Sequence, residues 1–92
     1  MRRIVIKKSY YEIPEDATPQ VRWLLNLMNE YDLTMRSLAK EIHLSKQAVS
    51  FWVEGVTKIS FGNICAIVYK IDKHADPEAI YKMIYKDSQK KQ

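Results

Sequence analysis

Four side chains between positions 46 and 51 are suited to contacting the edges of nucleic-acid bases. Lys46 can donate to guanine O6 and N7, and the carboxamide of Gln47 can pair with adenine. Ser50 can donate or accept, and Phe51 can touch a thymine methyl group. Because helical residues three or four apart share a face, a helix here would place all four side chains together. An ordinary solvated surface also accounts for Lys46 and Ser50, and a packing neighbour would account for Phe51.

The residues around this segment are spaced as in two short helices joined by a tight turn. Ala39 is small where two helices would approach closely, and His43 follows at the turn. Val49 and Trp52, further along the chain, are expected to point back toward the first helix. Gly55 is expected to end the second helix with a left-handed backbone. The pattern predicts a helix-turn-helix whose second helix is exposed on one face.

The stretch Thr34–Ile71 resembles the Cro/lambda-repressor-like, XRE-type helix-turn-helix family. The likeness extends to a core aromatic, a helix-ending glycine, a helix cap and an apolar stripe, at Trp52, Gly55, Ser60, Ile64 and Ile67. Three positions depart from the family pattern: His43 replaces the turn glycine, Val53 an acidic residue, and Ile59 a proline. His43 must therefore adopt a backbone angle that histidine tolerates better than most residues. The resemblance implies an all-α, five-helix domain that places one helix in the DNA major groove.

Helix start signals divide the chain in the same way. Five caps are expected, two of them followed by proline: Thr18, Thr34, Ser45, Ser60 and Asp76. The first helix should bury Val21, Leu24, Leu25, Met28 and Tyr31, with Arg22, Asn26, Asn29 and Glu30 facing water. The last helix should bury Ile80, Met83 and Ile84. We expect a helix-turn-helix domain over residues 18–87 and a polar tail over 88–92 that frays.

Residues 1–17 are expected to form a basic arm or a strand before the domain. The β-branched and aromatic residues of positions 1–13 favour a strand. Such a segment could reach along DNA through Arg2 and Arg3, or pair with its twin in a dimer through Ile4–Ile6. A third possibility is a strand folded onto its own domain near Trp23.

Phosphate contacts are implied by the resemblance at the start of the second helix and in the loop after Gly55. Together with the third-helix cap and the arginines of the arm, the predicted set is Thr34, Arg36, Ser45, Thr57, Lys58, Arg2 and Arg3. For each of these residues, an ordinary helix cap or a solvated charge is the alternative interpretation.

Composition limits the other function classes. The 92 residues are 47% hydrophobic and carry a net charge of +4, which suits one small domain and weakly favours a polyanionic partner. No apolar run approaches the roughly 18 residues of a membrane span, and we see no signal peptide. The single Cys65 is expected to be a buried apolar residue in a reducing cytoplasm.

Signals of catalysis or cofactor binding are weak. His43 and His74 are far apart and have no metal-ligand spacing, and two glycines cannot build a phosphate-binding loop. We therefore expect no enzyme, no metal or other cofactor, and no small-molecule ligand.

The sequence predicts a sequence-specific double-stranded-DNA-binding transcription regulator. The short chain favours a Cro-like repressor that acts as a homodimer in the cytoplasm of a bacterium or a phage-infected cell. Ile80 and Ile84, or the Ile4–Ile6 segment, are the expected dimer surfaces. The alternative is a protein-interaction module with the same fold, such as an antitoxin, an anti-repressor or an inhibitor of a nuclease system.

Overall fold

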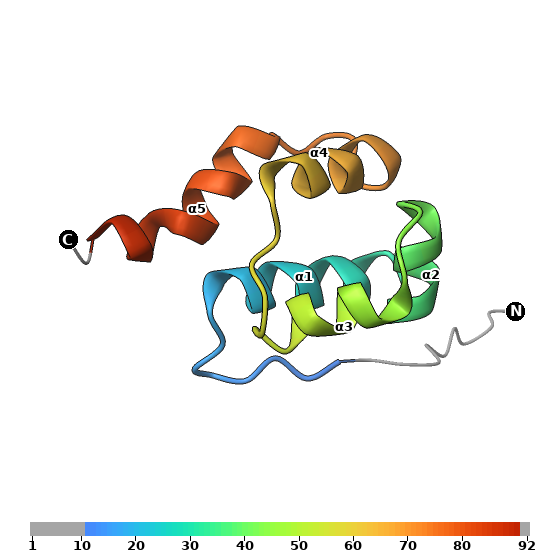
Figure 1. Cartoon of the computed structure of the whole chain (residues 1–92), viewed down its shortest axis with the longest axis horizontal. Helices are drawn as coiled ribbons and strands as arrows, with labels where there is room; N and C mark the ends of the chain where they lie inside the picture. The colour runs from blue at the N-terminus through green and yellow to red at the C-terminus, as the bar shows by residue number, and fades with distance from the viewer. Residues whose placement is uncertain (1–10, 91–92) are drawn as a thin grey trace, which may run out of the picture.

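The computed structural model describes residues 11–90, which form five helices joined by short loops. The helices are α1 (Pro19–Glu30), α2 (Met35–Glu41), α3 (Lys46–Val53), α4 (Phe61–Lys70) and α5 (Pro77–Lys90). In Figure 1, α3 runs alongside α1, α2 lies across one end of this pair, and α4 and α5 lie on the other side of α1. The all-α, five-helix prediction is confirmed. The expectations for Arg2, Arg3 and Ile4–Ile6 concern residues outside the described range.

Every predicted cap accepts a hydrogen bond from the backbone at the start of its helix. The bonds run from Val21 N to Thr18, Ser37 N to Thr34, Ala48 N to Ser45, Asn63 N to Ser60, and Glu78 N to Asp76, at 3.1–3.3 Å. Each cap satisfies a donor that has no partner within the helix, and such a bond contributes about 1 kcal/mol. Local sequence therefore determines where the helices begin.

A single hydrophobic core joins the helices. Its fully buried side chains come from four helices and the loop before α4, and include Leu24, Met28, Leu38, Val49, Ile59, Ile64 and Ile67. Ile59, which stands where the family commonly has proline, is therefore a core residue. None of the helices within residues 11–90 combines the length and the hydropathy that crossing a membrane would require.

The segment before α1 corrects two expectations. Asn29 is buried, although its position in α1 predicted a water-facing side chain. Its carboxamide accepts from the N–H of Tyr11 and donates to the carbonyl of Tyr11, both at 2.8 Å. Tyr11–Ile13, the described part of the expected strand, are not in a strand. The reason is that the backbone of Tyr11 pairs with a side chain of α1 instead of with another strand.

The last two helices correct three further expectations. Met83 is 42% exposed and so is not a core residue, and Cys65 is only half-buried. Ile80 and Ile84 are buried in the core of the protomer, which leaves them unable to form a dimer surface. Helix α5 extends past residue 87, to Lys90. No glycine or proline follows Pro77, so the sequence contains no helix breaker at the expected end.

Three helices end at a residue in the left-handed region. The φ angles are 57° at Asp32, 61° at His43 and 79° at Gly55. In each case the following N–H returns to a carbonyl of the last turn, as in a Schellman motif. These bonds join Leu33 N to Met28 O, Leu44 N to Ala39 O, and Val56 N to Phe51 O, at 2.8–2.9 Å. His43 therefore has the left-handed backbone conformation that its place at the turn predicts.

The two glycines should respond to alanine in opposite directions. A Cβ at Gly55 would lie 3.8 Å from Val21 Cγ2 and one at Gly62 would lie 3.9 Å from Ser60 Oγ, so both fit. Gly55→Ala should nevertheless destabilise the fold by about 1–2 kcal/mol, because its φ is positive. Gly62→Ala, inside α4, should stabilise it by about 0.4–1 kcal/mol. Chemical denaturation of both variants checks this, and equal effects of the same sign would contradict it.

Candidate nucleic-acid interface

The rotation of α3 agrees with the helix-turn-helix prediction. Val49 is fully buried and Trp52 is 5% exposed, and both belong to the core that α1 and α2 share with α3. Lys46 and Gln47 are exposed in the first turn. Because Val49 and Trp52 bury one face of this eight-residue helix, the opposite face is the one left open.

Ser50 and Phe51 lie at a less open part of the same helix. Ser50 is half-buried, and its hydroxyl donates to the carboxylate of Glu54 at 3.2 Å. The hydroxyl proton is thus used within the helix, while the oxygen can still accept from a base amino group. Phe51 is 37% exposed, so much of its ring is covered by the protein and the rest can contact a thymine methyl.

The start of α2 is held by a reciprocal pair of hydrogen bonds. Ser37 N donates to the Thr34 hydroxyl at 3.1 Å, and Thr34 N donates to the Ser37 hydroxyl at 2.8 Å. This capping box orders the first turn and leaves Arg36 exposed within it. Ser45 is likewise exposed at the start of α3, where its oxygen accepts from Ala48 N.

The loop between α3 and α4 is held by a buried glutamine that the sequence interpretation overlooked. Gln20 Nε2 donates to the carbonyls of Trp52 and Thr57 at 3.0 and 2.9 Å. Its Oε1 accepts from Ile59 N at 3.0 Å. A signal was available, since Gln20 precedes Leu24 by four residues and so lies on the buried stripe of α1.

The same loop is also contacted by α5. The hydroxyl of Tyr85 donates to the carbonyl of Ile59, and Lys58 Nζ lies 5.1 Å from the centre of the Tyr85 ring. Thr57 and Lys58, two of the predicted phosphate contacts, are both exposed. The predicted residues of the third helix and of this loop therefore lie on one continuous segment, residues 46–58.

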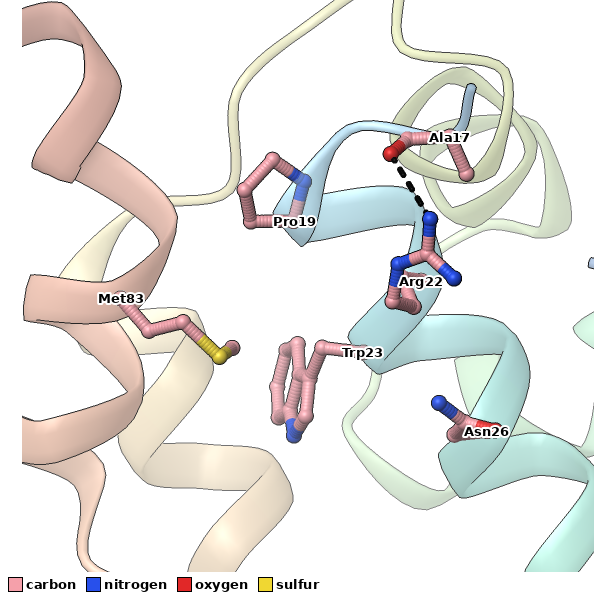
Figure 2. A pocket seen from close by; sticks show the side chains of 6 residues that line it. All are labelled: Ala17, Pro19, Arg22, Trp23, Asn26 and Met83. Atoms are coloured by element: carbon pink, nitrogen blue, oxygen red, sulfur yellow. Dashed lines mark hydrogen bonds between the residues drawn. The ribbon is translucent and has the colours of Figure 1, made fainter. Parts of the chain in front are cut away.

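A separate groove lies between α1 and α5. Its volume is about 550 Å³, and it is lined by Ala17, Pro19, Arg22, Trp23, Asn26 and Met83. Figure 2 shows Trp23 turned toward Met83, which identifies α5 as a neighbour of this ring. The Arg22 guanidinium donates to the carbonyls of Glu15 and Ala17 at 3.1 and 3.5 Å, so part of the rim is fixed. None of the predicted DNA contacts within residues 11–90 lines this groove.

The arrangement defines a helix-turn-helix DNA-binding domain. A family model described as helix-turn-helix matches residues 24–73, which is more than half of the chain. The protein belongs to this family, the XRE-type, Cro/lambda-repressor-like helix-turn-helix regulators. No curated protein and no solved structure matches the chain.

Gln47 should carry sequence preference. Its carboxamide offers a donor and an acceptor in the first exposed turn of α3, which matches the edge of adenine. Gln47→Ala should cost about 1–3 kcal/mol of DNA binding, mainly on duplexes that keep the preferred base at one position. Binding to single-base variants of an enriched duplex measures this. An equal loss on every variant would show that Gln47 is not a base contact.

Proposed function

We propose that this protein binds double-stranded DNA at specific sequences and represses transcription as a small Cro-like regulator. Family membership supports a DNA-binding helix-turn-helix regulator in general. The observation that carries the specific proposal is the orientation of α3, which buries Val49 and Trp52 and exposes Lys46 and Gln47. A helix held in this way can enter the major groove with its first turn toward the bases.

The proposed contacts fall into two chemical groups. Lys46, Gln47, Ser50 and Phe51 contact base edges, with Ser50 acting as an acceptor because its proton is given to Glu54. The phosphate contacts come from the first turn of α2, the cap of α3 and the loop after Gly55, through Thr34, Arg36, Ser45, Thr57 and Lys58. Arg2 and Arg3 would add charge from the segment before the described residues.

Enrichment of duplexes from a random pool tests the function directly. We expect one preferred sequence, with affinity falling on the order of a thousandfold between 50 and 200 mM salt if each subunit neutralises about three or four phosphates. Recovery of no preferred duplex, or an affinity independent of salt, would contradict sequence-specific DNA binding. The protein-interaction alternative would then gain support, because Phe61, Tyr81 and Met83 are large apolar side chains on the surface.

The active form is proposed to be a homodimer on a two-fold symmetric site. One helix such as α3 spans only a few base pairs, and two related half-sites about 34 Å apart would supply the missing specificity. With Ile80 and Ile84 buried, the exposed side of α5 near Tyr81 and Met83 becomes the candidate surface on that helix. The Ile4–Ile6 segment is the other candidate.

Footprinting on the enriched duplex should show two protected regions separated by one helical turn, and sedimentation should show a dimer. Deleting residues 1–8 distinguishes the two surfaces. Loss of the dimer would assign the interface to the N-terminal segment, whereas an intact dimer with a reduced salt dependence would assign that segment to DNA. A single protected region bound by a monomer would contradict the dimer.

A further inference from the structure

The loop that connects α3 to α4 is braced by two helices that carry none of the proposed DNA contacts. We propose that Gln20 of α1 and Tyr85 of α5 are positioning residues that hold Thr57 and Lys58 in place for phosphate binding. This inference rests on the proposed function and deepens it. It assigns a part in DNA recognition to side chains that lie outside the helix-turn-helix itself.

Gln20 constrains the backbone of the loop. Its single carboxamide bonds to Trp52 O at the end of α3, to Thr57 O in the loop and to Ile59 N before α4. Gln20 is 6% exposed, and its bonds to Trp52 and Ile59 are buried and so shielded from competing water, while the bond to Thr57 is part-buried. Because they span residues 52–59, the path of the loop is tied to the position of α3. The proposed base contacts of α3 and the proposed phosphate contacts of the loop are thereby held in fixed positions relative to each other.

Tyr85 constrains both the backbone and the side chain of the lysine. Its hydroxyl donates to the Ile59 carbonyl, and its ring lies under the Lys58 ammonium at 5.1 Å. A lysine resting on an aromatic face loses part of its freedom before binding, yet an ammonium has three donors and can still bond a phosphate. Burial, followed by the neighbouring Tyr81, raises the pKa of Tyr85, so the hydroxyl remains a donor at neutral pH.

A row of aromatic rings supports Tyr85. The ring centres of Tyr85 and Tyr81 are 4.6 Å apart, and those of Tyr81 and Phe61 are 5.3 Å apart in an edge-to-face arrangement. Phe61 begins α4 directly after the braced loop, and Tyr81 and Tyr85 lie one turn apart on α5. The position of α5 is thus connected to the loop through packed rings as well as through the hydrogen bond to Ile59.

The test compares Tyr85→Leu, Tyr85→Phe, Lys58→Ala and the Lys58→Ala/Tyr85→Leu double variant on the enriched duplex between 50 and 200 mM salt. Lys58→Ala should reduce the slope of log affinity against log salt by about 0.9 per subunit. Tyr85→Leu should weaken binding about two- to fivefold per subunit and also lower the slope, whereas Tyr85→Phe keeps the ring and should preserve the slope. Tyr69→Leu, at a 74% exposed tyrosine of α4, is the matched control.

The double variant separates positioning from general stability. If the ring of Tyr85 acts through Lys58, then Tyr85→Leu should lower the salt slope no further once Lys58 is alanine, and its effect on affinity should be smaller than in the wild type. A merely structural role would lower the thermal midpoint and add its full effect in the double variant, which would overturn the inference for Tyr85. An unchanged affinity and slope in Tyr85→Leu would overturn it as well.

Gln20 is tested in the protein without DNA and then on the duplex. Gln20→Met keeps the length of the side chain but cannot bond, so the Ile59 amide should exchange its hydrogen faster, and the salt slope on the duplex should fall. An unchanged exchange rate or an unchanged slope would overturn the role of Gln20.

If the wild-type chain protects this amide but binds no duplex, the proposed DNA function fails, and the positioning roles fail with it. Steep salt-dependent binding by the wild type, unaltered in the Gln20 and Tyr85 variants, would overturn only the positioning roles.

Discussion

The burial of Val49 and Trp52 is the constraint on which the proposed recognition surface depends. With these two side chains in the core, α3 cannot rotate about its axis without exposing one of them. Exposing a fully buried apolar side chain costs about 1.5–3 kcal/mol, which is a large part of the stability of a small domain. The core therefore determines that Lys46 and Gln47 face outward, and the residues at those positions determine the chemistry offered to a partner.

The direction in which α3 leaves the turn depends on backbone conformation as much as on packing. His43 holds a left-handed angle at the end of α2, and Leu44 N returns to Ala39 O, which closes the helix and reverses the chain. A side chain at such an angle costs roughly 1–2 kcal/mol relative to an ordinary conformation. Here the short turn and the core contacts of the flanking helices maintain it. Asp32 ends α1 in the same way, so two of the three left-handed helix ends use a residue other than glycine.

Much of the fold could be predicted because its determinants are local. Cap residues mark the helix starts, and the three-to-four-residue spacing of apolar side chains identified most of the buried face of α1 and the buried face of α3. For Gln20, Asn29 and Tyr85, this spacing can at most place a side chain on a buried stripe, as it does for Gln20, and does not identify the hydrogen-bond partners. Each is polar, and each bonds to the backbone of a segment at least 18 residues away. Their roles depend on which segments the core brings together, and periodicity carries no information about that.

Met83 shows the same limit for an apolar side chain. Its spacing with Ile80 and Ile84 suits a core stripe, but among the described helices α5 packs mainly against α4 and α1, and Ile80 and Ile84 are the side chains that are buried. Met83 is left beside Trp23 at the groove of Figure 2. The predicted base and phosphate contacts remain predictions, because their partners come from outside the chain.

A titration of isotope-labelled protein with the enriched duplex, followed residue by residue by NMR, tests the central claim most directly. The account predicts the largest amide shift changes in three places: the first turn of α2, residues 46–51 of α3, and the loop 55–58. Changes confined to the groove around Trp23 and Met83, or to the exposed rings of Phe61 and Tyr81, would show that α3 is not the recognition element.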